Sequence, residues 1–246
     1  MSESIWNLVP IVIAAGLLRG YSGFGFAAVA IVGFNFFAPP QQGVPVILGL
    51  DVLCSVGLWQ QARRQADIPT FKTLALGALI GIPVGLALLI FIPETLLKLL
   101  ICIAILLFTL ALMFDLRVNN TDTFKSKLSF GLASGAGTAG ASVGGPMILS
   151  YMLSSSLSSV TQRATMILFF MVSESLAFMA ILISGLIDLE IVRLLFILLL
   201  PTMLSVRAGQ WLFNRKPPKS LKHFALPIMG LAALLGISAS IGALMH

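Results

Sequence analysis

Long apolar runs separated by short polar connectors dominate the chain. The uninterrupted runs are long enough for helices that cross a bilayer, and they lie at residues 44–61, 70–92, 95–114, 161–186, 191–213 and 221–244. At about 20 residues per spanning helix, the chain has room for roughly seven or eight membrane segments and no separate soluble domain. The pattern therefore predicts an all-α polytopic membrane protein.

Two further apolar runs, 5–37 and 128–153, are broken by glycine. Each broken run precedes three unbroken ones, so the order of elements occurs twice, which indicates an internal repeat. A sequence alignment that places Ser22 over Ser142 superposes the two most glycine-rich stretches. We expect a first repeat over 1–115 and a second over 128–246, joined by a polar connector at 116–127.

Loop charge indicates that the two repeats are inverted relative to each other. The connector at 62–69 is basic, whereas its counterpart around 187–190 is acidic. The opposite holds for the next pair of loops: 93–94 contains Glu94, whereas its counterpart 214–220 is basic. Because cytoplasmic loops collect Lys and Arg, these swaps favour two inverted repeats over eight simple spans.

Inversion requires an odd number of crossings in each repeat. Three helices satisfy this if each broken run enters and leaves the membrane at the same face, as a re-entrant helical hairpin. We therefore expect the loops 62–69, 115–127 and 214–220 to be cytoplasmic. Eight simple spans remain the alternative, and they would place the basic loop 214–220 outside the cell.

Composition excludes several functional classes. Hydrophobic residues make up 58% of the chain, charged residues only 10%, and the net charge is +6. This excludes a soluble enzyme, a disordered regulator and a DNA-binding domain, and we expect no nucleic-acid partner. Two histidines and two cysteines form no metal-ligand spacing, so neither a metal site nor a cofactor is expected.

Two short motifs suggest an enzyme only superficially. Residues 135–140 fit the dinucleotide pattern G-x-G-x-x-G, but no strand precedes them. Residues 140–144 fit G-x-S-x-G, but His223 adjoins the basic loop 214–220 and His246 is the last residue, so no histidine lies at membrane depth to activate the serine. We expect no catalytic residues, and an intramembrane enzyme is the less favoured alternative.

Four charged residues lie within apolar runs and well away from their ends: Arg19, Asp51, Glu174 and Arg207. A charge at bilayer depth costs about 3 kcal/mol or more, so such residues serve a pathway or pair with one another. One interpretation is two structural ion pairs. The other is that the arginines attract an anion, while the carboxylates balance them or bind a coupling ion. Arg163 lies near the end of a run, where we expect it to snorkel to the interface.

The glycine breaks themselves suggest a binding site. Broken helices at membrane depth expose N-terminal N–H groups, which attract anions, and paired breaks in two repeats point to a site near the midplane. We expect the substrate to contact the following residues: Arg19, Gly20, Tyr21, Ser22, Gly23, Phe24, Gly25, Ser142, Gly144, Gly145, Pro146 and Arg207.

These stretches resemble the sulfite exporter TauE/SafE family of membrane permeases, and the resemblance spans essentially the whole chain. It rests on the segments 18–26, 39–40, 63–64, 131–135, 144–146 and 207–209. The chain departs from many members in having Phe24-Gly25-Phe26 in place of a Gly-Gly pair, and Met147 in place of a second proline.

The resemblance implies a secondary-active transporter of small anions such as sulfite, sulfoacetate or another organosulfonate. It also implies a multi-pass protein of the bacterial plasma membrane. Alternating access around the two breaks is the expected mechanism, and a passive anion channel is the alternative. Proton or sodium coupling and assembly as a homodimer stay open at this stage.

Overall fold

The computed structural model describes residues 2–114 and 122–215, and these are helical with short connections. The predicted segment 221–244, the first half of the predicted connector (116–121) and residues 216–220 of the predicted basic loop lie outside the described residues. The elements are α1 (Ser2–Ser22), α2 (Phe26–Phe34), α3 (Pro40–Ser55), η1 (Val56–Leu58), α4 (Trp59–Gln65), α5 (Ile68–Phe91), α6 (Glu94–Met113), α7 (Phe124–Ala141), α8 (Gly145–Ser154), α9 (Ser159–Ile183) and α10 (Leu189–Arg215).

Helix starts follow the sequence signals for capping. The Asp67 carboxylate accepts a hydrogen bond from the Thr70 N–H at the start of α5, and Ser158 caps α9 through Thr161 in the same way. Pro40 and Pro146 stand in the first turns of α3 and α8, where a missing N–H removes no helical hydrogen bond. These caps fix where the helices begin.

Four stretches are long and apolar enough to cross a membrane: Pro40–Gln65, which joins α3, η1 and α4, together with α5, α9 and α10. Large apolar side chains on α5 and α10 are exposed, among them Phe91 and Phe196. An exposed apolar surface of this kind is typical of contact with lipid. The all-helical prediction is therefore confirmed for the described residues.

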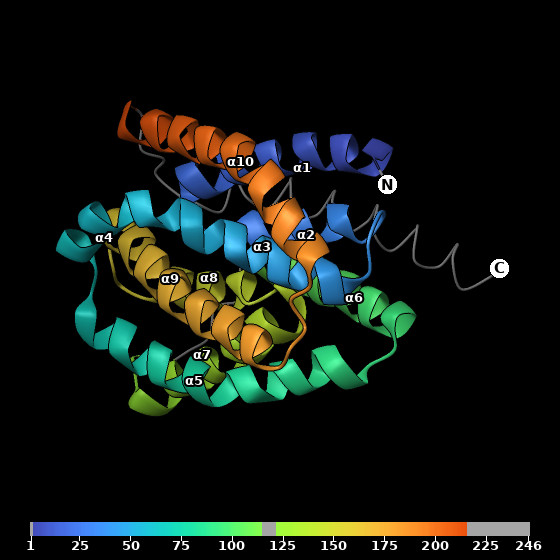
Figure 1. Cartoon of the computed structure of the whole chain (residues 1–246). Helices are drawn as coiled ribbons and strands as arrows, with labels where there is room; N and C mark the ends of the chain where they lie inside the picture. Colours follow the sequence, from blue (N-terminus) through green and yellow to red (C-terminus); the bar gives the residue numbers. More distant parts are fainter. Residues whose placement is uncertain (1, 115–121, 216–246) are drawn as a thin grey trace.

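Helices of the first half pair closely with helices of the second half. In Figure 1, α10 lies along α1, and α5 lies along α7, with α3 and α9 between these two pairs. A Cβ added at Gly20 would overlap the Val206 carbonyl of α10, and one added at Gly81 would overlap the Leu132 carbonyl of α7. Small residues thus bring the backbones into contact, which is how transmembrane helices commonly pack.

Both glycine-broken runs form helical hairpins. The first consists of α1 and α2, and the second of α7 and α8. The chain starts the second hairpin beside Asp122 and leaves it at Ser154–Ser156, and these residues line one open cavity of about 500 Å³ together with Asp67. The second hairpin therefore begins and ends at the same end of the molecule.

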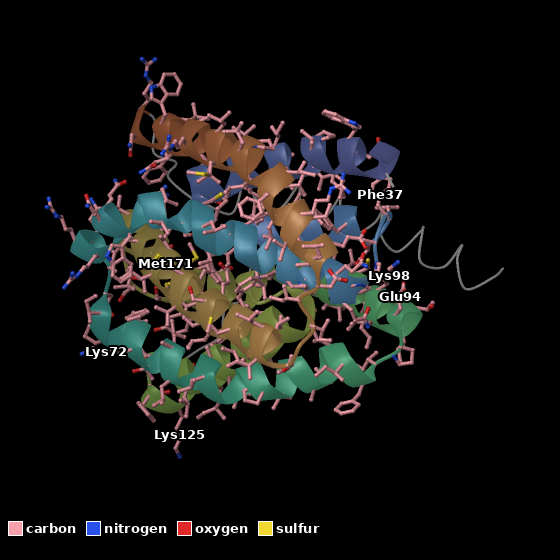
Figure 2. The ribbon with its side chains drawn as sticks, in the orientation of Figure 1. Phe37, Lys72, Glu94, Lys98, Lys125 and Met171 are labelled. Carbon is pink, nitrogen blue, oxygen red and sulfur yellow. The ribbon has the colours of Figure 1, made fainter. Side chains whose placement is uncertain are left out.

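The two ends of the molecule differ in the residues they carry. Figure 2 shows Lys72 and Lys125 at the left end, and Glu94, Lys98 and Phe37 at the opposite end. At the left end, Lys127 forms an ion pair with Asp122 at 2.8 Å, and this hydrogen bond raises the pKa of Lys127. At the other end, Lys98 pairs with Glu94 within α6.

Candidate functional site

Each hairpin turns at a residue in the left-handed backbone conformation. The Gly23 N–H donates to the Arg19 carbonyl, and the Ser142 N–H donates to the Thr138 carbonyl, so each closes the last turn of its helix. Gly23 has φ +82° and Ser142 has φ +55°. Left-handed residues of this kind commonly end helices.

This geometry makes Gly23 the structural counterpart of Ser142. The alignment made from the sequence, which pairs Ser22 with Ser142, is therefore shifted by one residue at the breaks. The same correspondence pairs Arg19 with Thr138 and Gly25 with Gly144. Gly25 and Gly144 in turn precede the first residues of α2 and α8.

The two breaks face a common small cavity of about 10 Å³, roughly the space of one water molecule. It is bounded by the ends of the broken helices and by side chains from α3 and α9. The lining residues are Arg19, Gly25, Ala27, Ala28, Asp51, Thr138, Ser142, Gly144, Gly145, Phe170 and Glu174.

The first turns of α2 and α8 both lie at this cavity. Ala27 and Ala28 belong to the start of α2, and Gly145 is the first residue of α8. The first N–H groups of a helix have no acceptor within the helix, and they carry the positive end of its dipole. Two such ends at one cavity create a local preference for negative charge.

The guanidinium of Arg19 is buried, with 1% of the residue exposed, and it joins three helices. Its Nε lies 2.8 Å from Oδ1 of Asp51, while Nη1 donates to the Gly23 carbonyl at 2.6 Å and Nη2 to the Ser55 hydroxyl at 2.9 Å. Arg19 thus holds the first break and joins α1 to α3.

Glu174 supplies a second carboxyl from α9. Its Oε2 lies 3.9 Å from Nη2 of Arg19 and has no hydrogen-bond partner in residues 2–114 and 122–215, although Glu174 is only 3% exposed. The carboxyl groups of Asp51 and Glu174 thus approach the same guanidinium from two different helices. The ring of Phe170 lies 5.3 Å from the Arg19 guanidinium carbon. The cluster therefore holds one cation and two acidic groups.

Ser142 offers an unpartnered polar group to the cavity. The residue is 1% exposed, and its hydroxyl has no hydrogen-bond partner among the described residues. A buried hydroxyl without a partner is unfavourable unless something occupies its hydrogen-bonding position. Neighbouring hydroxyls behave differently: Ser134 donates to the Gly144 carbonyl, and Ser22 donates to Leu18 and Phe24 carbonyls.

Several residues predicted for the site play structural parts here. Gly20 packs on α10, and Tyr21 lies edge-on to Phe213 at 6.1 Å. Phe24 is fully buried beside the cavity rather than lining it, and Pro146 is buried in the first turn of α8. The binding roles of these residues stay predictions.

Arg207 does not join the other charges. It is exposed on α10 and does not line the cavity, so the structure brings together Arg19, Asp51 and Glu174 but not the second predicted cation. The face of α10 that packs on α1 carries Val206 and Gly209, and Arg207 lies outside this face.

Arg163 was expected to snorkel toward the interface, and that expectation is wrong. The residue is 3% exposed, its Nη2 donates to the Gly20 carbonyl at 2.7 Å, and its guanidinium carbon lies 4.0 Å from the centre of the Phe213 ring. The last carbonyls of α1 therefore accept hydrogen bonds from α9, where they have no helical donor. Thr138, Ser55 and Phe170 are further site residues that the sequence did not single out.

The comparison with family models decides the family. The model of the sulfite exporter TauE/SafE family matches residues 8–236, which is most of the chain. The chain belongs to the TauE/SafE sulfite exporter family. No curated protein and no solved structure was found to match it.

Membership confirms the resemblance seen in the sequence. TauE/SafE is a family of membrane transporters, and the four apolar helices of this chain agree with a membrane protein. A transporter family is also consistent with the expectation that the chain is not an enzyme. The buried cluster of Arg19, Asp51, Glu174 and Ser142 at the two breaks is then the candidate substrate site of a transporter.

Proposed function

We propose that this chain is a secondary-active transporter of small oxyanions, with sulfite, sulfoacetate or another organosulfonate as the substrate class. The single observation that carries the proposal is that the first turns of α2 and α8 meet at one buried cavity that also contains Arg19 and the unpartnered Ser142 hydroxyl. Backbone N–H groups, a cation and a hydroxyl donor together form a typical oxyanion site.

The wider architecture supports alternating access between two inverted repeats. In the proposed repeats, α1 corresponds to α7 and α5 corresponds to α10. The contact of α10 with α1 is then the counterpart of the contact of α5 with α7, and each joins one half of the chain to the other. Because the second hairpin starts and ends at one end of the molecule, a re-entrant course of α7 and α8 accounts for the charge swap between the repeats. We infer a bacterial plasma-membrane protein with Lys72 and Lys125 on the cytoplasmic side.

The small size of the cavity favours a carrier over a passive channel. At about 10 Å³ it does not admit an oxyanion, so a substrate has to displace the helix breaks to bind. Arg207 has no part in this proposal because it lies away from the cavity. Rocking of one repeat against the other would open the site to one side at a time.

Replacement of Ser142 by alanine tests the site. The change removes the unpartnered hydroxyl without breaking a hydrogen bond, so stability should change little. Loss of a hydrogen bond to a charged ligand costs about 1.5–3 kcal/mol, so the affinity for the anion should fall about tenfold or more. Thermal-shift titration of purified protein with sulfite, sulfoacetate, sulfate and ethanesulfonate measures this affinity.

Ser175→Ala is the matched control, because that hydroxyl donates to the Met171 carbonyl within α9 and does not line the cavity. The control should bind anions as the native protein does. Equal affinities for Ser142→Ala and the native protein would exclude Ser142 from the site. If the native protein is stabilised by none of the four anions, the proposed substrate class is wrong.

A further inference from the structure

The carboxyl pair of Asp51 and Glu174 has a feature that anion binding alone does not require. The two groups are 2% and 3% exposed, come from α3 and α9, and approach the same guanidinium: Asp51 Oδ1 lies 2.8 Å from Arg19 Nε, and Glu174 Oε2 lies 3.9 Å from Arg19 Nη2. Two buried carboxylates that share one cation repel each other, and a proton on one of the two removes this repulsion. The geometry therefore favours one proton on the pair.

The charge balance of the cluster leads to the same conclusion. One guanidinium faces two carboxyl groups, and Oε2 of Glu174 is left without a hydrogen-bond partner at 3.9 Å from Arg19. With one shared proton the buried cluster is neutral, whereas two carboxylates would leave an uncompensated buried charge.

Few other ionisable groups surround the pair in the part of the chain that the structure describes. They are Arg19 on α1, Cys54 on α3 and, through Arg19, Arg163 on α9. The helices α2 and α8, which complete the cavity, carry no acidic or basic side chain. A proton that enters the cluster therefore resides on one of the two carboxyls.

An anion that enters the cavity competes with Asp51 for Arg19. The Asp51 Oδ1 atom lies 2.8 Å from Arg19 Nε, so the guanidinium is already paired. If Asp51 takes up a second proton from water as a monovalent anion binds, the guanidinium becomes free and the buried net charge stays at zero. We propose that the Asp51–Glu174 carboxyl pair is a proton-binding site that couples the uptake of one proton to each oxyanion bound at Arg19.

This inference rests on the proposed function and adds the coupling ion to it. By linkage, protons raise the affinity for the anion by the same factor by which the anion raises the affinity for protons. Ethanesulfonate is the suitable probe because a sulfonate keeps its charge at every pH used. Its affinity should rise about tenfold for each pH unit by which the pH is lowered, as one bound proton requires.

The native protein allows a direct test without mutation. Ethanesulfonate added to weakly buffered purified protein should raise the pH of the solution, with about one proton taken up per anion bound. Binding is measured in parallel by thermal shift. Binding without proton uptake would overturn the coupling proposal and leave the proposed function intact, whereas absence of binding by every anion tested would overturn both.

Proteoliposomes with an inward proton gradient test the carboxyl pair in transport. The double variant Asp51→Asn/Glu174→Gln has no carboxyl left to take up the proton, so it should exchange labelled ethanesulfonate across the membrane but should not accumulate it against its gradient. The single variant Glu174→Gln keeps Asp51 and should still accumulate it. The control Glu94→Gln, which changes a carboxylate in the ion pair with Lys98, should accumulate it as the native protein does. Accumulation by the double variant at the native level would overturn the proposal.

Discussion

The two helix breaks are alike in backbone and different in chemistry. Both end a helix at a left-handed residue, Gly23 in the first and Ser142 in the second, and in both a new helix starts three residues later. Four positions before the left-handed residue stands Arg19 in the first break but Thr138 in the second. The first break thus contributes charge to the cavity, and the second contributes hydroxyl groups.

This difference gives the two breaks unlike roles at the cavity. The hydroxyl of Ser22 is satisfied within the first break, whereas that of Ser142 is not satisfied in the second. The Arg19 charge is balanced by Asp51 and Glu174, which come from neither broken helix. An oxyanion in the cavity would therefore have its cation on one side and its hydroxyl donor on the other.

Removal of Arg19 should have the largest effect. Arg19→Gln leaves Asp51 and Glu174 without their cation, and breaking a buried ion pair costs about 3–5 kcal/mol. The double variant Arg19→Gln/Asp51→Asn should recover much of that stability but should not bind anions. Thermal melting in detergent measures both variants.

Thr138→Val is the matched change in the second break, and it should alter stability by about 1 kcal/mol or less, because it removes a hydroxyl and not a charge. Similar losses for Arg19→Gln and Thr138→Val would contradict the division of chemistry between the two breaks.

Exchanging the left-handed residues should produce smaller effects of opposite sign. Gly23→Ala should cost about 1–2 kcal/mol, because a residue with a Cβ is strained at positive φ. In addition, the new Cβ would lie 2.7 Å from Cγ of Arg163. Ser142→Gly should stabilise the protein by up to about 1 kcal/mol, since it relieves the same strain. If both variants shift the melting temperature in the same direction, the backbone equivalence of the two positions is wrong.

The smallest change in stability is expected at the solvent-exposed ion pair between Asp122 and Lys127. Asp122 and Lys127 are 2.8 Å apart, as Asp51 and Arg19 are, but the Asp122 side chain is 91% exposed. Asp122→Asn should therefore change stability by less than about 1 kcal/mol.

The pH dependence of that small effect has a definite sign. Asp122 raises the pKa of Lys127 in the folded protein, so its contribution is present below the pKa of Lys127 in the unfolded chain. The contribution disappears as the pH rises through the folded pKa. Melting curves of the native protein and Asp122→Asn should differ slightly at neutral pH and coincide at strongly alkaline pH. A difference that grows with alkalinity would contradict this assignment.

The sequence predicted the order of elements well because apolar length and glycine breaks are local signals. Apolar run length placed α3 to α6, α9 and α10, and the glycine clusters marked both hairpins. The alignment of the breaks was wrong by one residue, because it paired Ser22 with Ser142 by residue identity. Gly23 and Ser142 correspond through their left-handed φ angles, and the amino-acid sequence does not give these angles directly.

The two arginines illustrate why side-chain direction was harder to predict. Arg163 is buried against α1 and Arg207 is exposed, although both lie within apolar runs. In a soluble helix, the polar face marks the outside, but a helix surrounded by lipid is apolar on every face. Hydrophobic periodicity therefore does not show which arginine points inward. Arg19, Asp51 and Glu174 could be predicted as site residues because a charge at bilayer depth has a high free-energy cost.

The close pairing of α1 with α10 has a consequence for synthesis of the protein. The ribosome makes α1 long before α10, and the glycine face of α1 packs on α10, so Gly16 and Gly20 lack their packing partners until residues 202–206 have been made. The partner of α5 arrives much sooner, with α7. Until α10 has been made, the first hairpin therefore lacks its packing partner, and this incomplete state occurs during every synthesis of the protein.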